Sequence, residues 1–190
     1  DAMIMPPLMI ISGFAPKNGV HAIRIAAAAI AEMAIGRIGD DTTVNVGQIE
    51  GGRASNIVPD YCEVSGELRS FSHEKALEEL AKVEQIFAKE AEKRGGSIEF
   101  IRDICYQAYK TDEKESVVKE FQKACTACGI KSSLIATFGG SDQNKMSEHG
   151  IPGIVMASAM HQVHSCQEYT EVSEMAQVAG IVSELLQMKE

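Results

Sequence analysis

The sequence predicts an α+β protein. Its first half is a ferredoxin-like two-layer sandwich, and its second half is a partial α/β segment. Two observations support this: the apolar patterns of the first hundred residues run strand, helix, strand, strand, helix, strand, and the pattern changes after residue 104. The βαββαβ order is that of an antiparallel sheet covered on one face by two helices. We therefore expect one domain over 1–104 and a second over 105–190.

The elements of the first half follow from the spacing of their apolar residues. Helices repeat apolar residues every three or four positions, whereas half-buried strands alternate. Pro6-Pro7 favours a first strand that begins after the prolines at a sheet edge, because proline has no N–H to donate. Ser72 can cap the second helix. In order, we expect a strand within 3–11, a helix over 20–36, strands over 43–49 and 57–70, a helix from 72 to 95, and a strand over 97–104.

The second half shows helical patterns separated by short apolar runs. Helix, strand, helix, strand and helix in alternation are typical of parallel α/β architecture. Two short strands make a small sheet, so this segment is expected to be part of a larger layer. We expect helices over 117–128, 143–149 and 172–188, buried strands over 133–136 and 154–157, and polar loops over 139–142 and 158–169.

Composition excludes several classes of protein. Eighteen basic against 27 acidic side chains leave a net charge of −9, so a nucleic-acid partner is not expected. No apolar run reaches the roughly 18 residues of a membrane span. With 45% apolar residues the chain can form a core. Five thinly spread cysteines fit reduced thiols in a cytoplasmic protein better than a disulfide framework.

Gly139, Gly140, Ser141 and Asp142 form the first cluster that could carry chemistry. Glycines let backbone N–H groups approach a ligand, and the N-terminus of a helix favours anions. Asp142 would add an acceptor or a metal ligand. Taken by itself, such a string is more often an ordinary turn.

The second cluster lies in the loop after the last expected strand. It contains His161 and His164, with Glu168 nearby. Neutral imidazole is a common metal ligand, and a carboxylate beside it can orient the ring. Zinc needs three or four protein ligands, for which His149 and Asp142 are the local candidates. Solvated loop histidines explain the pattern equally well.

Two further patterns permit more than one interpretation. Asn56 and Arg69 could hold a ligand, since an amide donates and accepts and a guanidinium matches a carboxylate, but a hairpin turn with a surface arginine also fits. Cys125 and Cys128 have redox spacing, yet they lie late in a helix, away from any nucleotide motif. A structural or incidental pair is therefore the favoured interpretation of the cysteines.

Taken together, these strings resemble the peptidase T-like zinc aminopeptidases of the aminoacylase and carboxypeptidase G superfamily. Gly13–Ile23, Thr42–Gly52 and Ala54–Pro59 are similar to the dimerisation, or lid, domain of that family. Gly139–Asp142 and His164–Glu168 are similar to its C-terminal catalytic segment. The resemblance covers nearly the whole chain from residue 13 onward.

The resemblance implies a ferredoxin-like lid, which agrees with the element order above, and a homodimer formed through it. It also implies two zinc ions that activate water to hydrolyse a short peptide or a related amide, with a glutamate as base. His164 would be the last zinc ligand, with Glu168 and His161 beside it. Asn56 and Arg69 would hold the backbone or carboxylate of the substrate. The site would be lined by the loop that contains Gly139, Gly140, Ser141 and Asp142.

Two departures from the family pattern limit what the chain itself is expected to do. The other metal ligands and the base of the family lie upstream of the lid in a His-x-Asp motif and a Glu-Glu pair, and this sequence contains no His-x-Asp. Ile11 stands where the family has a histidine that acts as an oxyanion donor. We therefore expect a chain that is incomplete and inactive by itself. The alternatives are a non-catalytic dimerising or ligand-binding module, and a small redox or metal protein built on Cys125 and Cys128. The last alternative predicts a thiol with a lowered pKa.

Overall fold

The computed structural model describes residues 2–4 and 19–188, which divide into two compact units between Ala108 and Tyr109. From sequence we expected the boundary after residue 104. Unit 1 extends to Ala108, and unit 2 begins at Tyr109.

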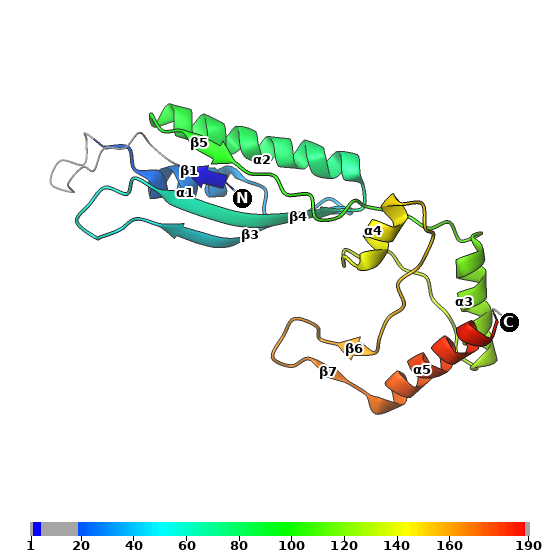
Figure 1. Ribbon diagram of the computed structural model, residues 1–190. Coiled ribbons are helices and arrows are strands. Elements are labelled where there is room, and N and C mark those ends of the chain that lie inside the picture. The colour runs from blue at the N-terminus through cyan, green and yellow to red at the C-terminus, as the bar shows by residue number, and fades with distance from the viewer. Residues whose placement is uncertain (1, 5–18, 189–190) are drawn as a thin grey trace. The chain divides into compact units, whose positions relative to one another are not determined.

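Unit 1 contains a five-stranded antiparallel sheet in the order β2-β3-β4-β1-β5 (Figure 1). Without the short edge strand β2, this is the strand order of a ferredoxin-like sandwich, so the predicted fold class is confirmed. The strands are β1 (Ala2–Ile4), β2 (Gly36–Ile38), β3 (Thr42–Gly51), β4 (Cys62–Ser70) and β5 (Ile98–Phe100).

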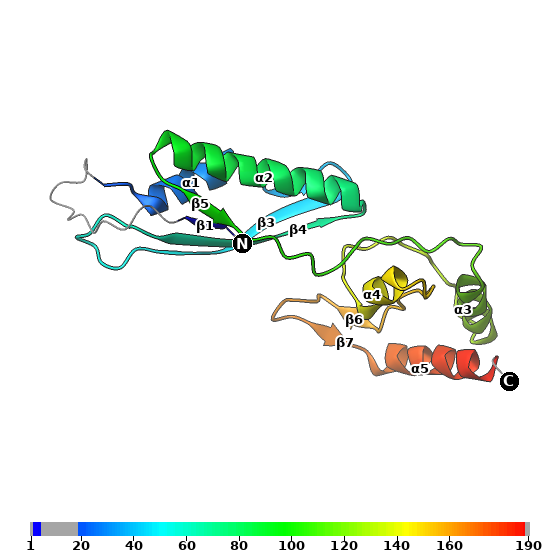
Figure 2. The ribbon, with the colours of Figure 1, turned by 45° about the horizontal axis from the view of Figure 1, so that its top comes forward.

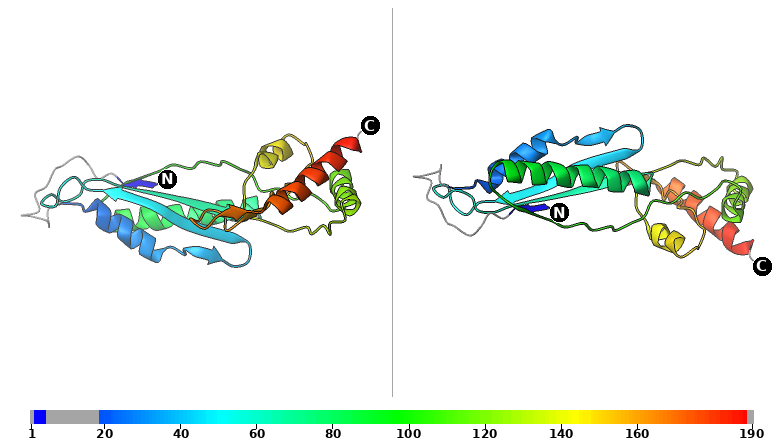
Figure 3. Two further views of the ribbon diagram at one scale, coloured as in Figure 1. Left: turned by 90° about the horizontal axis from the view of Figure 1, so that it is seen from below. Right: turned by 90° about the horizontal axis from the view of Figure 1, so that it is seen from above.

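Two helices, α1 (Ala22–Glu32) and α2 (His73–Lys93), cover the same face of this sheet (Figures 2 and 3). Helix α1 contacts β3, β4 and β1, whereas α2 contacts β4, β1 and β5. Helix α1 therefore lies toward the β2–β3 side of the sheet and α2 toward the β5 side. Among the described residues of unit 1, the opposite face of the sheet carries no helix.

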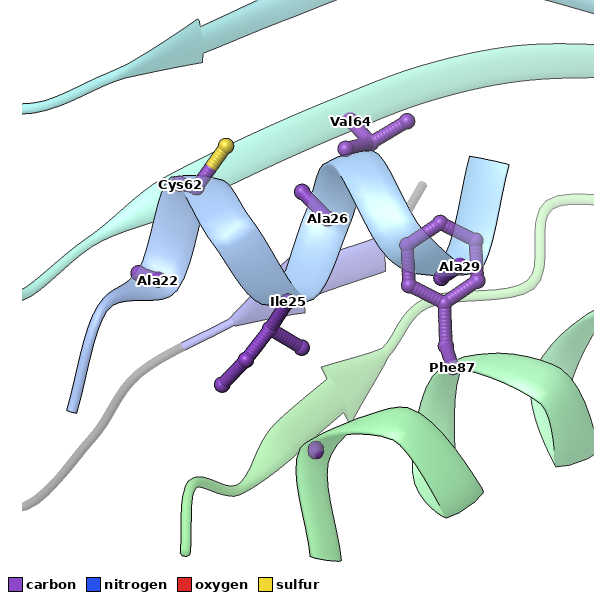
Figure 4. Close-up of a cluster of buried hydrophobic side chains, with 8 residues drawn as sticks. Ala22, Ile25, Ala26, Ala29, Cys62, Val64 and Phe87 are labelled. Carbon is purple, nitrogen blue, oxygen red and sulfur yellow. The ribbon is translucent and has the colours of Figure 1, made fainter. Parts of the chain in front are cut away.

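The core of unit 1 lies where the two helices meet the sheet. Figure 4 shows Phe87 of α2 directed toward Ala29 of α1, and Val64 of β4 belongs to the same buried cluster. Phe87 is 1% exposed and Ala29 is fully buried. Small residues on the inner face of α1 let the helix approach the sheet closely enough to close around the ring. Full burial of a phenylalanine contributes about 1.5–3 kcal/mol to folding.

Both helices begin at side-chain caps. The Ser72 hydroxyl accepts a hydrogen bond from the Lys75 N–H, as predicted, and His21 Nδ1 accepts one from the Arg24 N–H at 3.2 Å. The carboxylate of Glu32 accepts from Lys89 Nζ at 2.5 Å, which links α1 to α2 and raises the pKa of Lys89.

The beginning of the sheet differs from the sequence-based expectation. Strand β1 lies before Pro6-Pro7 and pairs with both β4 and β5, so it occupies a central position in the sheet. The edge strand expected after the prolines falls outside the described residues. The remainder of the expected 3–11 strand, and Ile11 with it, lies outside the described residues.

The first helix is also shorter than expected. It ends at Glu32 instead of residue 36, because Met33 adopts an extended conformation. Gly36 then takes a positive φ of 93° and the chain pairs with β3 as strand β2, which the sequence reading missed. Strands β4 and β5 are also shorter than expected. Strand β4 covers Cys62–Ser70 instead of 57–70, and β5 covers Ile98–Phe100 instead of 97–104.

Strands β3 and β4 approach most closely at Gly66. A Cβ at this position would lie 2.5 Å from the Asn45 backbone oxygen of the neighbouring strand, a distance that no side chain tolerates. Gly47, on β3 at a register shift between Val46 and Gln48, has no such restriction, because its nearest neighbour to an added Cβ is 3.8 Å away. Glycine is therefore required at one of these two positions only.

Unit 2 contains three helices and a two-stranded antiparallel sheet. Helices α3 and α5 pack together around buried Ala124, Cys125 and Ile181. The Thr111 hydroxyl donates to the Gly153 carbonyl at 2.6 Å, which ties the start of the unit to its middle. Its elements are α3 (Ser116–Ala127), α4 (Asp142–Glu148), β6 (Met160–His161), β7 (Tyr169–Thr170) and α5 (Val172–Gln187).

The three helices of unit 2 agree with the sequence, but the two expected parallel strands do not form among the described residues. The segments over 133–136 and 154–157 have no strand partner there, and Ile135 and Val155 are 82% and 56% exposed. A strand exists only through hydrogen bonds to a neighbour, so an apolar run by itself does not produce one. The expected polar loop instead contains the β6–β7 hairpin. Among the described residues no helix combines the length and apolar character needed to cross a membrane.

Replacing Gly66 with alanine is expected to lower the free energy of unfolding by about 1–3 kcal/mol, because the new methyl group overlaps the Asn45 carbonyl. The matched substitution Gly47→Ala is expected to be neutral or slightly stabilising, since it only restricts the unfolded chain. Urea unfolding of both variants measures the difference. Equal stabilities of the two variants would show that the close approach of the strands is not real.

Candidate functional site

The loop that carries Asn56 joins β3 to β4 and is fastened to helix α1. The Ala22 N–H, one of the first N–H groups of α1, donates to the Pro59 carbonyl at 2.9 Å. Arg53 makes two contacts of 3.2 Å with the Asp60 carboxylate across the base of the loop. Asn56 is exposed between these anchors. The fold therefore holds Asn56 on a braced loop that is open to solvent.

Arg69 lies on β4 beside an acidic partner on the same strand. Its Nε and Nη2 contact the two carboxylate oxygens of Glu67 at 3.2 and 2.9 Å. Side chains two apart on a strand share a face, and Cys62 and Val64 at the other parity are buried under the helices. Arg69 and Glu67 therefore lie on the face that the helices leave uncovered, 46% and 56% exposed. A substrate carboxylate would have to compete with Glu67 for this guanidinium.

Tyr61, which immediately precedes β4, contacts Glu63 of that strand, and the sequence analysis did not select this pair. The Tyr61 hydroxyl donates to the Glu63 carboxylate, and Glu50 stands directly opposite Glu63 on β3. The hydrogen bond to Glu63 raises the pKa of Tyr61 to about 12, and burial and the charges of Glu63 and Glu50 act in the same direction. Only the register of β3 with β4 brings Glu50 near, so no local sequence signal identifies this group.

The cluster Gly139–Asp142 ends in the short helix α4. The Gly139 N–H donates to the Thr137 hydroxyl at 3.1 Å, and the Ser141 N–H donates to Asn144 Oδ1 at 3.0 Å. Ser141 Oγ is buried and has no hydrogen-bond partner among the described residues. Asp142 is exposed at the first position of α4, where the helix favours a negative charge.

The two candidate histidines occupy one hairpin but have different surroundings. His164 is exposed in the loop between β6 and β7, and its backbone N–H donates to Glu168 Oε2 at 3.0 Å. Glu168 thus supports the backbone of His164 in this structure. His161 stacks on Tyr169 and its Nε2 lies 2.6 Å from Glu174 Oε2. The sequence reading missed Tyr169 and Glu174, because a cross-strand pair and a helix position bring them to His161.

The described residues do not complete a metal site. None of their histidine, cysteine, aspartate and glutamate side chains gather into a group of three or more that could hold a metal ion. His149, a local candidate, caps the C-terminal end of α4, and Asp142 starts the same helix. Zinc needs three or four ligands, so these residues alone do not fit a zinc ion.

The cysteine pair does not have the environment of a redox centre. Cys125 is 1% exposed in the core of unit 2. Burial raises the pKa of its thiol, and the neighbouring Cys128 adds to the rise. The redox hypothesis predicts a thiol with a lowered pKa, and the burial of Cys125 acts in the opposite direction.

A ferredoxin-like unit with two helices on one face is followed in this chain by a helical unit with an exposed histidine loop. Residues 12–95 match the family described as the peptidase dimerisation domain. The resemblance to peptidase T-like metallopeptidases is confirmed by relatives that are similar along nearly the whole chain.

Among these relatives is the aminopeptidase PepT from Bacillus cereus, which is 35% identical. This chain matches it over 98% of its own length and 50% of the other, with a TM-score of 0.83. A tripeptidase from Staphylococcus aureus is 30% identical over the same shares, with a TM-score of 0.89. The uncharacterized protein YqjE of Bacillus subtilis is 34% identical over 93% of this chain and 47% of that protein. This chain therefore spans about half the length of these relatives.

A further structure shares the fold at 18% identity and a TM-score of 0.68. It is a dinuclear metal-binding peptidase from Bacillus subtilis, and this chain covers 48% of it.

Titration of tyrosine absorbance tests the Tyr61–Glu63 contact. The difference between the wild-type chain and Tyr61→Phe is expected to have a midpoint near pH 12, against 10.0 for an ordinary tyrosine. Because the folded state holds the proton more tightly, the stability that this contact contributes is complete below pH 10 and disappears between pH 10 and 12. Glu63→Gln is expected to return the midpoint toward 10, and a wild-type midpoint already at 10 would refute the contact.

Proposed function

We propose that this chain supplies the dimerisation domain and the C-terminal catalytic segment of a zinc-dependent peptidase that hydrolyses short peptides or related amides. The observation that carries the proposal is similarity over 98% of the chain, at 35% and 30% identity, to an aminopeptidase and a tripeptidase. Similarity that extends through both units, rather than the dimerisation domain alone, favours a catalytic parent over a purely associating module.

In this proposal His164 is a ligand of one of two zinc ions. Support comes from its exposed position on a held loop and from the dinuclear peptidase that shares the fold. The remaining ligands and the base would come from outside the described residues, which by themselves hold no group suited to a metal. The chain without those groups would be inactive.

The proposed substrate contacts follow from the resemblance. Asn56 would hydrogen-bond the substrate backbone and Arg69 would bind its carboxylate, while the 139–142 loop would line the site. The ion pair of Arg69 with Glu67 is exposed, and such pairs contribute about 0–1 kcal/mol. A substrate carboxylate could therefore replace Glu67 at small free-energy cost, and a peptide with a free carboxyl end suits this arrangement.

The proposed partner is a second copy of the chain, which pairs through the β2 edge and helix α1. Strand β2 forms one edge of the sheet, and edge strands pair readily with another chain. On the same side, α1 exposes Ala27 and Ala31, and Ile35 next to β2 is 47% exposed. On the β5 side, Glu84 of α2 pairs with Arg102, which follows β5, so that side is charged. The apolar side is therefore the one suited to self-association.

We propose a cytoplasmic location, with neither nucleic acid nor membrane as a partner. All five cysteines are free thiols, as expected in a reducing compartment. The net charge of −9 opposes binding to phosphate backbones.

Metal content tests the role of His164. In the protein encoded by the complete reading frame, we expect two bound zinc ions and peptide hydrolysis, and a loss of metal affinity of roughly tenfold or more in His164→Ala, because a direct ligand is removed. His149→Ala serves as the control and should retain its zinc. Unchanged zinc content in His164→Ala would rule out this residue as a ligand.

Light scattering tests the dimer. The wild-type mass is expected to equal two chains of 20.5 kDa, and Ala31→Glu on α1 should give the mass of one chain, since it places a charge in the apolar interface. The matched variant Ala88→Glu, at an exposed position of α2, should remain dimeric. A single-chain mass for the wild type, or dissociation of both variants alike, would contradict the assignment.

A further inference from the structure

The hairpin that carries His164 has an unusual backbone. Ala159, Gln162 and His164 have φ values of 61°, 51° and 63°, so three residues with side chains adopt the left-handed region within six positions. Each such residue is strained by about 1–3 kcal/mol, and it persists only where surrounding contacts determine it. The hairpin must therefore be held by contacts strong enough to offset this strain.

The strands of the hairpin are too short to hold it unaided. Only two residue pairs, Met160 with Thr170 and His161 with Tyr169, form the ladder. An isolated hairpin of two strands is marginal even when it is longer. Inside the loop, Ser165 Oγ donates to the Gln162 carbonyl at 2.7 Å and accepts from the Gln167 N–H at 3.1 Å. These bonds shape the loop, but they do not attach it to the rest of unit 2.

Strand β7 continues through Glu171 into α5, and His161 adds a side-chain attachment between the hairpin and that helix. Its ring stacks on Tyr169 with centroids 4.8 Å apart and an interplanar angle of 15°. Its Nε2 lies 2.6 Å from Glu174 Oε2, and Glu174 lies in the first turn of α5. The dipole of a helix stabilises a carboxylate in its first turn, so Glu174 accepts from the Nε2–H of His161. One side chain thus joins both strands of the hairpin to the adjacent helix.

We propose that His161, Tyr169 and Glu174 form a clamp on the loop over 162–168. The clamp holds Gln162 and His164 at their positive φ values and so sets the direction in which His164 is presented. His161 is a positioning residue in this arrangement. Tyr169 and Glu174 fix its ring from two sides, and the Glu168 carboxylate completes the support at the His164 N–H. The value of this positioning for catalysis rests on the proposed function, but the clamp itself does not.

Amide hydrogen exchange of the chain, followed by NMR, tests the clamp. The His164 N–H is bonded to Glu168 and exchanges when the loop opens. Glu174→Leu and His161→Phe, which keeps the stacked ring but removes Nε2, are each expected to accelerate this exchange by about five- to tenfold, the equivalent of one hydrogen bond. Glu174→Gln keeps an acceptor oxygen and should restore exchange close to the wild-type rate.

Two controls make the result specific. Glu171→Gln removes a carboxylate that makes no side-chain capping bond at the start of α5, and it should leave the His164 exchange rate unchanged. The Gly96 N–H in unit 1, bonded to the Ala91 carbonyl, should exchange equally in all variants and reports that the chain is folded. Unchanged exchange in both His161→Phe and Glu174→Leu, or equal acceleration in Glu171→Gln, would overturn the clamp.

The outcome is separable from that of the metal experiment. If His164→Ala keeps its zinc while the exchange rates change as expected, His164 is not a ligand and the clamp stands. If the zinc is lost on His164→Ala but exchange is unaffected by His161→Phe and Glu174→Leu, the ligand stands and the clamp is refuted.

Discussion

The closure of two helices over one face of the sheet around Phe87 is the interaction on which the described structure of unit 1 depends. The ring is fully enclosed only because α1 presents small side chains such as Ala26 and Ala29 toward the sheet. Replacing these alanines with larger residues would separate α1 from β4 and open the core, because interiors are packed at crystal density. The position of the Asn56 loop follows from the same contact, since its Pro59 carbonyl accepts from the first turn of α1.

Unit 2 depends on a different balance. Its own buried core is small, around Ala124, Cys125 and Ile181, and several apolar side chains are exposed, among them Ile135 and Val155. The candidate residues of this unit are therefore positioned by local polar contacts instead of deep packing. The strained loop of His164 is the clearest case, because hydrogen bonds and one stacked ring pair determine its conformation.

Two of the candidate residues, Arg69 and His164, already have a contact within the chain. Arg69 is paired with Glu67, and the His164 N–H is bonded to Glu168. Such pairing restricts the rotamers and backbone angles of the residues before any ligand arrives. Pre-organisation of this kind reduces the entropy that binding must offset.

Apolar periodicity, the Ser72 cap and the motif strings are local properties of the chain. They were therefore enough to predict the βαββαβ order, both helices of unit 1 and the family resemblance. The sequence also selected Asn56, Arg69 and His164, whose functional roles remain predictions. The central position of β1 and the edge strand Gly36–Ile38 became visible only in the folded chain. The same is true of 133–136 and 154–157, which have no strand partner among the described residues, and of the contact between Glu174 and His161. These features could not be predicted because strand pairing and side-chain contacts depend on residues that are distant in sequence, and no local pattern specifies them.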